Sequence, residues 1–249
     1  MYIDTSVSAI MYADDILLLA PSVTELQRII AKCCSELTLL DLEVNPLKSA
    51  ILRIGSKYNI TCPQLRIGGV VVDWSIETKY LGVFIKTGPK FKCNFDRCKV
   101  KFYQSANAIL SKLGNQPNAA VSTHLIAAMA LPALTYACEA LSLNASEKNT
   151  IDHPWLRTFQ RIYHTFDKNT VKQCQWYTGH LPINHYYVMR TFTFLLSLKH
   201  SINKLLRTIF DNYGHDAMRS IADSYNCKFD LFLKDYHNVI LKSFYNEIV

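Results

Sequence analysis

The order of apolar and polar residues changes along the chain, and its first part is typical of short strands. Residues 7–19, VSAIMYADDILLL, hold two apolar runs of strand length on either side of Ala13, Asp14 and Asp15. This pattern predicts a β-hairpin with an acidic tip. The tip lacks the Asn-Gly or Asp-Gly pair that favours two-residue turns, so its adjacent carboxylates require another explanation.

One amphipathic helix interrupts these strands. Ser22 and Glu25 have the spacing of a capping box, and apolar residues then recur every three or four positions as far as Leu40. Asn45-Pro46 indicates the end of this segment. Further strand structure is predicted at 50–54, at 64–73 as a hairpin around Gly68-Gly69, and at 79–86 as a single strand.

Beyond residue 90 the apolar period becomes helical. Apolar residues step by three or four over 95–113, and Gly114 supplies a C-terminal stop. The same spacing recurs at 155–166 and 187–196. We therefore expect an α+β fold, with a mixed domain at residues 1–90 and an all-helical domain at residues 91–249.

One apolar stretch has the length of a membrane span. Residues 125–143 are mostly apolar, but they contain Pro132 and Glu139, and many of the others are Ala, Ser and Thr. A carboxylate inside hydrocarbon is unfavourable, and alanines contribute little transfer energy. This stretch therefore predicts a buried helix followed by a second segment, and no membrane partner.

Composition narrows the class of protein. The chain is 49% apolar and 19% charged, which excludes a disordered chain. Its eight cysteines form no CxxC pair and no zinc-ligand spacing with histidine. They are expected to be buried apolar groups of a protein in a reducing compartment, the nucleus or the cytoplasm.

Positive charge is concentrated in one part of the chain. Residues 1–90 carry nine basic and nine acidic side chains, whereas residues 91–249 carry eighteen and eleven. Within residues 86–112, seven basic residues accompany a single acid, Asp96. This concentration indicates a polyanionic partner, nucleic acid or an anionic surface, although a solvated helix face gives the same pattern.

Asp14 and Asp15 are the strongest candidates for chemistry. Neighbouring carboxylates repel each other at a partly buried tip unless a cation neutralises them. Successive residues of a strand face opposite sides, so both reach one ion only at a tight turn. Oxygen ligands favour Mg²⁺ or Mn²⁺ over zinc. An exposed acidic turn without a metal is the alternative.

Several motifs together resemble a known family. YADD at 12–15 is followed by a helix, by NPLKS at 45–49 and by KYLG at 79–82. This order resembles the palm of reverse transcriptases of non-LTR (LINE-type) retrotransposons. Two later stretches are similar to further family segments: LPALTYA at 131–137, with Ala137 where glycine is usual, and TGHLPI at 178–183.

The resemblance implies roles for the first motifs. Asp14 and Asp15 would be the metal-binding pair of the polymerase centre, with Mg²⁺ or Mn²⁺ as cofactor. Tyr12 would lie near the primer end and the incoming dNTP. Lys48 would lie near the triphosphate, where a cation stabilises the leaving pyrophosphate.

The resemblance also implies a nucleic-acid path. Tyr80, Leu81 and Gly82 resemble the primer-grip strand, where glycine allows close approach of the backbone. Residues 1–90 would then be a partial palm and residues 91–249 a thumb with a C-terminal extension, holding an RNA template and a DNA primer. Phosphate contacts would come from Lys90, Lys92, Arg97, Lys99 and Lys101.

One part of the family pattern has no counterpart here. The family places another essential aspartate on an earlier strand, and only eleven residues precede Tyr12. Asp4 is about 30 Å from Asp14 in an extended chain. We expect a fragment that does not polymerise alone. A non-catalytic nucleic-acid-binding protein derived from such an element, or a helical protein with an accidental acidic pair, are the alternatives.

Overall fold

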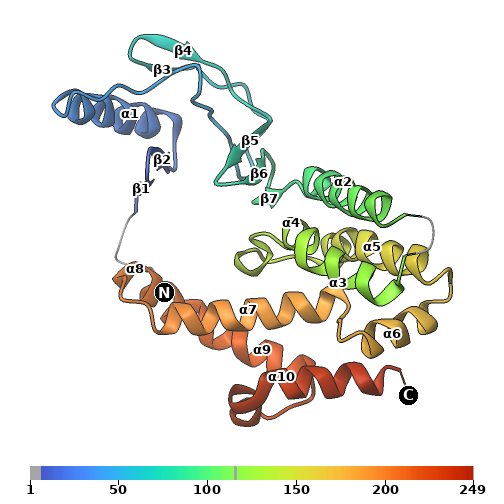
Figure 1. The fold of residues 1–249 in the computed structure, drawn as a ribbon. Coiled ribbons are helices and arrows are strands. Elements are labelled where there is room, and N and C mark those ends of the chain that lie inside the picture. Colours follow the sequence, from blue (N-terminus) through green and yellow to red (C-terminus); the bar gives the residue numbers. More distant parts are fainter. Residues whose placement is uncertain (1–6, 115–116, 249) are drawn as a thin grey trace. The chain divides into compact units, whose positions relative to one another are not determined.

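The computed structural model describes residues 7–114 and 117–248, and the chain is α+β. It divides into two compact units, Met1–Asn94 and Phe95–Val249 (Figure 1). In the part of the chain that the structure describes, all strands lie in the first unit, and the elements of the second are helices. The division lies four residues beyond residue 90, where the sequence predicts the change from mixed to helical structure.

The described residues of the first unit form one helix and three small antiparallel sheets. Its elements are β1 (Ala9–Tyr12), β2 (Asp15–Leu18), α1 (Val23–Thr38), β3 (Leu65–Ile67), β4 (Val70–Val72), β5 (Glu77–Tyr80), β6 (Val83–Lys86) and β7 (Lys92–Cys93). Strands β1 and β2 form one sheet, β3 and β4 a second, and β5, β6 and β7 a third.

Two predicted hairpins and the predicted helix are confirmed. Strands β1 and β2 pair antiparallel across the acidic tip, and β3 and β4 pair across Gly68-Gly69. Both of these glycines have positive φ, which their lack of a Cβ makes inexpensive. Ser22 caps α1 by accepting a hydrogen bond from the backbone N–H of Glu25 at 3.2 Å.

The core of this unit is small and lies between α1 and the β3–β4 hairpin. It consists of Ile30, Ile51, Leu65, Ile67 and Val72. The side chain of Gln27 connects helix and hairpin through two hydrogen bonds with the backbone of Arg66, at 2.8 and 2.9 Å. Leu18 of β2 packs against the same core, so the acidic hairpin is attached through its second strand.

Two of the strand predictions are wrong. Residues 79–86 form two strands, because Leu81 and Gly82 both have positive φ and reverse the chain between β5 and β6. Residues 50–54 form no ladder; Ile51 and Ile54 make isolated parallel bridges to Trp74 and Gly88. Short apolar runs do not distinguish these arrangements from a continuous strand.

The second unit is a helical array (Figure 1). Its elements are α2 (Asp96–Leu113), α3 (Ala119–Met129), α4 (Leu131–Leu134), η1 (Cys138–Ala140), α5 (Ala145–Ile162), α6 (Lys168–Tyr177), α7 (Ile183–Lys199), α8 (Lys204–Ile209), η2 (Phe210–Gly214), α9 (His215–Ser224) and α10 (Phe229–Asn246). Helix α2 has the predicted stop at Gly114, which has positive φ. Helix α5 ends at Ile162, so the predicted helical continuation to Phe166 is wrong.

Aromatic side chains fill the interior of this unit. One apolar cluster joins α7, η2, α9 and α10 around Phe192, Phe210, Phe232 and Phe244. Trp155 of α5 is fully buried, and its indole N–H donates to the carbonyl of Leu181 at 3.0 Å. A buried Trp that also satisfies its N–H is a strong packing anchor.

As predicted, the apolar stretch at 125–143 breaks after a first helix: α3 ends at Met129, and α4, which contains Pro132, and η1 follow. Glu139 forms an ion pair with Arg190 of α7 at 3.0 Å. Within the described residues, no single helix is long and apolar enough to cross a membrane, although the bent pair Ala119–Met129 and Leu131–Ala140 meets the length and composition criteria together.

The cysteines are less buried than their sequence context predicts. None of the eight forms a disulfide, and only Cys138 is buried, while the others are half-buried. Burial raises the thiol pKa of Cys33, Cys98 and Cys174. A raised pKa favours the protonated, unreactive thiol.

Candidate metal-binding hairpin and basic surface

The acidic tip is a two-residue turn. Tyr12 and Asp15 are paired in the β1–β2 ladder, so Ala13 and Asp14 alone make the connection. Ala13 has a φ of 50°, in the left-handed region that two-residue hairpin turns require and that disfavours a residue with a Cβ. Asp14 therefore lies in the turn itself, and Asp15 opens the returning strand.

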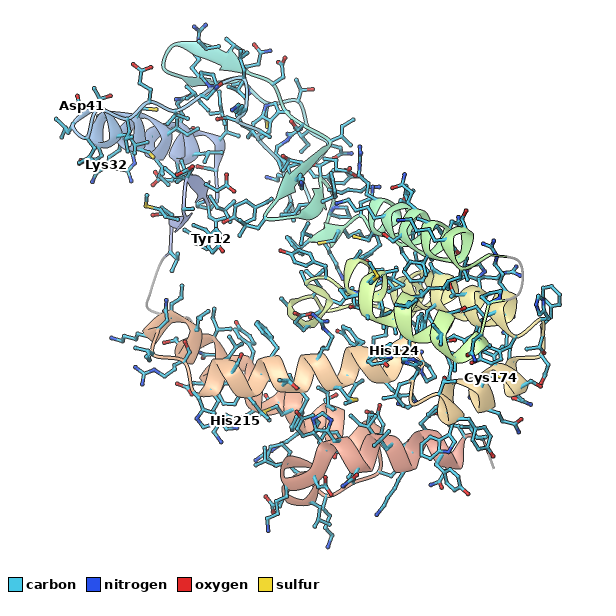
Figure 2. The ribbon with its side chains drawn as sticks, in the orientation of Figure 1. Tyr12, Lys32, Asp41, His124, Cys174 and His215 are labelled. Atoms are coloured by element: carbon cyan, nitrogen blue, oxygen red, sulfur yellow. The ribbon has the colours of Figure 1, made fainter. Side chains whose placement is uncertain are left out.

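The tip is exposed, contrary to the partly buried site that the sequence predicts. Asp14 and Asp15 are both exposed, as is every residue of β1. The side chains of Met11 and Tyr12 are 66% and 64% exposed, and Tyr12 is labelled at the hairpin in Figure 2. The core contact is made by Leu18, at the far end of β2. Water therefore screens the repulsion between the two carboxylates without a cation.

The donor set of the tip suits a hard divalent cation. Mg²⁺ keeps several waters in proteins and is usually held by one or two carboxylates together with substrate phosphates. Asp14 and Asp15 offer two accessible carboxylates at one turn, which fits this mode. Among the residues that the structure describes, no group of three His, Cys, Asp or Glu side chains is arranged to hold a metal.

Lys48 lies on a separate turn of the same unit. The side-chain carbonyl of Asn45 accepts hydrogen bonds from the backbone N–H groups of Leu47 and Lys48, at 3.0 and 3.3 Å. The hydroxyl of Ser49 donates to the carbonyl of Asn45 at 2.8 Å. The NPLKS motif is thus a self-capped turn that presents Lys48 to solvent.

The YLG motif also forms a turn, whereas the resemblance places it on a strand. Tyr80 pairs with Val83, so Leu81 and Gly82 are the two turn residues of the β5–β6 hairpin. Tyr80 is half-buried, and Leu81 is exposed. A role for this motif against a primer would therefore involve a hairpin tip.

The basic segment is divided between the two units. Lys90 and Lys92 are exposed in the first unit, and Arg97 and Lys101 are exposed on α2 of the second. Lys99 is half-buried and forms an ion pair with Asp96 at 2.7 Å, which reduces its availability as a free cation. The ammonium group of Lys86 lies 3.8 Å from the carboxylate of Glu77.

The candidate residues of the first unit lie on three separate turns. Tyr12, Asp14 and Asp15 meet on one hairpin, while Lys48 and the YLG turn lie on separate turns of the first unit. Among the described residues of the first unit, no ion pair joins Asp14 or Asp15 to Lys48, Lys90 or Lys92.

A groove between α2 and α5 was not predicted from the sequence. It consists of two hollows of about 850 and 470 Å³ that share Tyr103 and His153. Arg157 and Arg161 line the second hollow. A sequence signal exists, since residues 153, 157 and 161 carry His, Arg and Arg at helical spacing.

No family model, curated protein or solved structure matches this chain. The resemblance to reverse transcriptases therefore remains a hypothesis that depends on the motifs themselves.

Proposed function

We propose that this chain derives from the reverse transcriptase of a non-LTR retrotransposon and binds nucleic acid and a divalent cation. The observation that carries the proposal is the YADD sequence at a two-residue hairpin turn, with both acids accessible. A polymerase palm would need these residues to be open to phosphate oxygens and metal together. An acid pair within a continuous strand would not provide this.

Backbone conformation supports the family hypothesis at a second position. The family uses glycine where this chain has Ala137, and Ala137 has φ 58° and ψ 6°. This left-handed conformation favours glycine and costs an L-residue roughly 1–2 kcal/mol. The departure from the family pattern thus falls at a position where the fold itself favours the family's residue.

In the proposed function each group of the chain has a limited role. Asp14 and Asp15 would hold Mg²⁺, which when bound supplies charge stabilisation to phosphate oxygens. Lys48 would contribute a positive charge near the same phosphates, and the exposed basic side chains would contact the nucleic-acid backbone. Two-metal phosphoryl transfer needs two ions clamped about 3.5–4 Å apart. We propose that the two carboxylates of one turn do not provide this, so the chain binds without polymerising.

Metal binding at the tip is tested by titrating the full chain with Mn²⁺ in the presence of primed RNA template and following free Mn²⁺ by electron paramagnetic resonance. We expect the double variant Asp14→Asn/Asp15→Asn to weaken Mn²⁺ binding at least about tenfold, because the hard carboxylate ligands are lost. The matched control Asp211→Asn/Asp216→Asn removes two exposed acids of the helical unit and should have no effect. Equal affinity in wild type and tip variant would refute the metal site.

A nucleic-acid-binding protein without metal chemistry is the second candidate. The exposure of Lys90, Lys92, Arg97 and Lys101 favours it. Under this alternative Lys90→Gln/Lys92→Gln weakens binding to primed template. Asp14→Asn then changes neither nucleic-acid nor Mn²⁺ affinity, a combination that separates the two candidates.

A further inference from the structure

Helices α2 and α5 lie side by side in the helical unit and form an open groove between them (Figure 1). The lining of α2 includes Lys99, Tyr103 and Asn107, each four residues after the previous one. On α5 the corresponding residues are His153, Arg157 and Arg161, again at intervals of four. Each interval is about 6 Å along a helix, so polar groups follow both walls.

Direct contacts connect the two walls. The guanidinium of Arg161 donates to the side-chain carbonyl of Asn107 across the groove, at 2.6 Å. The positive charges of Arg157 and Lys99 act to lower the pKa of Tyr103, whereas burial, the larger effect, raises it. Tyr103 therefore lies close to cations of both helices.

The two arginines of the groove are held in place without a carboxylate. Arg157 donates to the imidazole of His153 and to the amide of Gln160, both at 3.4 Å, and Arg161 donates to Asn107. Among the described residues, no carboxylate forms an ion pair with either guanidinium. The one acid of the groove lining, Asp96, is paired with Lys99. Guanidinium groups ordered by neutral partners keep their full charge for a bound anion.

Aromatic surface accompanies this charge. Tyr103 is 36% exposed, and its ring lies edge-on to the buried Phe102 at 5.7 Å between centroids, which fixes its position. Phe166 lines the second hollow and is 80% exposed. Cations alternating with accessible rings are typical of surfaces that bind single-stranded nucleic acid, because phosphates meet the cations and unpaired bases stack on the rings.

We propose that the α2–α5 groove is a binding site for single-stranded nucleic acid. Arg157 and Arg161 contact successive phosphates, and Tyr103 stacks with a base. The two hollows of about 850 and 470 Å³ give the groove room for a short stretch of one strand. A duplex keeps its base faces stacked inside and cannot offer them to Tyr103. This site rests on the nucleic-acid-binding part of the proposed function but not on its metal chemistry.

The charge contribution is tested with the full chain and a fluorescein-labelled 12-nucleotide oligouridylate, measured by fluorescence anisotropy at several salt concentrations. We expect Arg157→Gln/Arg161→Gln to weaken binding about tenfold at 0.1 M salt. The slope of log K against log salt should become less steep by about 1.4, since each phosphate contact contributes about 0.7. Lys204→Gln/Arg207→Gln, which removes two positive charges from α8, should leave affinity and slope within twofold and 0.3 of wild type.

The stacking contribution is tested at Tyr103. Tyr103→Ala should weaken oligouridylate binding at least about fivefold, whereas Tyr103→Phe, which keeps the ring, should retain wild-type affinity. Circular dichroism verifies that each variant is folded. A blunt duplex of the same length and polyglutamate serve as competitors, and both should compete at least tenfold less well than unlabelled oligouridylate.

Three results would overturn the groove as a single-strand site: unchanged affinity in the folded double-arginine variant, equal loss in the α8 control, or stronger competition by duplex or polyglutamate. Failure of the groove is distinguishable from failure of the proposed function. Binding of primed template that depends on Lys90 and Lys92, with Mn²⁺ binding that depends on Asp14 and Asp15, would retain the proposed function while excluding this groove. If neither template binding nor Mn²⁺ binding depended on these residues, the oligouridylate measurements would still decide whether the groove binds a single strand.

Discussion

Among the described residues, six that carry side chains have a positive φ, which favours glycine, and three of them lie within the YADD, KYLG and LPALTYA motifs. Ala13, Leu81 and Ala137 have φ values of 50°, 44° and 58°. Ala13 and Leu81 lie in the turns of the β1–β2 and β5–β6 hairpins. Ala137 immediately precedes η1. Such positions store local strain of roughly 1–3 kcal/mol and tend to occur at functional sites.

Ala137→Gly should stabilise the protein. Removing the Cβ relieves roughly 1–2 kcal/mol of left-handed strain, and the greater freedom of glycine in the unfolded chain offsets about 0.4–1 kcal/mol of it. We expect a net increase of about 0.5–1 kcal/mol in the free energy of unfolding, measured by urea denaturation followed by circular dichroism.

The control for this substitution is Ala108→Gly, in the middle of α2 and exposed. There the same change should destabilise by about 1 kcal/mol, because glycine is a poor residue for a helix interior. Destabilisation of similar size at both positions would show that Ala137 is not strained.

Caps and stops were predictable at the scale of single residues, whereas exposure and left-handed alanines were not. Ser22 and Gly114 act locally, through a side chain bonding its own helix or a φ that only glycine adopts easily. The exposure of Asp14 and the conformation of Ala137 depend on which elements pack nearby. Residue spacing along the chain does not contain that information.

At the scale of elements, a polar cluster around the buried His185 joins the end of α10 to α6 and α7. The Nε2 of His185 lies 3.1 Å from the carboxylate of Glu247, and its Nδ1 lies 2.9 Å from the hydroxyl of Tyr225. Lys172 donates to the other oxygen of Glu247 at 2.7 Å. A neutral imidazole satisfies both contacts when Nε2–H donates to Glu247 and Nδ1 accepts from Tyr225.

This cluster should make stability fall as the pH drops below about 6.5. Burial lowers the pKa of His185 below its ordinary 6.5, and the charge of Glu247 only partly opposes this effect. The unfolded chain then binds a proton near pH 6.5 while the folded one does not, so the contribution is complete above that pH and is lost on acidification. Thermal unfolding between pH 7 and 5 should show the wild-type midpoint falling more steeply than that of His185→Gln.

Two other groups define the controls for this pH dependence. His237 is exposed, so His237→Gln should keep the wild-type slope. Burial, the largest cause, raises the pKa of Asp152, an effect in the opposite direction; the charge of His185 makes a smaller, lowering contribution, so the burial effect persists in His185→Gln. Parallel midpoint curves for wild type and His185→Gln would contradict the assignment of the acid sensitivity to this imidazole.

The sequence predicted whether a segment is a helix or a strand more reliably than it predicted the turns that connect the segments. The helical period of α2 is long, and its buried residues Phe102 and Ala106 lie on the apolar stripe, so the pattern is strong. KYLGVFIK reads as one strand because its apolar residues are continuous, yet Leu81 and Gly82 reverse it. A turn that places a leucine at positive φ has no local sequence signal.

At the scale of the whole molecule, the sequence indicates that the protein has a basic surface for a polyanionic partner, but it does not indicate where that surface lies. The net charge of residues 86–112 can be counted in the sequence. The groove cannot be found in this way, because its hydrogen-bonded residues Asn107 and Arg161 are 54 positions apart. Folding brings such residues together only through the packing of α2 against α5. Ion pairing with Asp96 and Glu77 also involves two of the basic side chains that the charge count treats as free.

Polymerase activity also depends on the whole molecule, because it requires a complete two-metal site. We expect the full chain, given Mg²⁺, dNTPs and a primed RNA template, to incorporate no nucleotide even though it binds the template. Two neighbouring carboxylates on an exposed hairpin fit one hydrated ion with phosphates, whereas in-line displacement needs two clamped ions. Primer extension resolved on a denaturing gel measures this, with template binding followed in parallel. Extension that Asp14→Asn abolishes would show that the tip completes a catalytic site, and the proposed function would then have to include polymerisation.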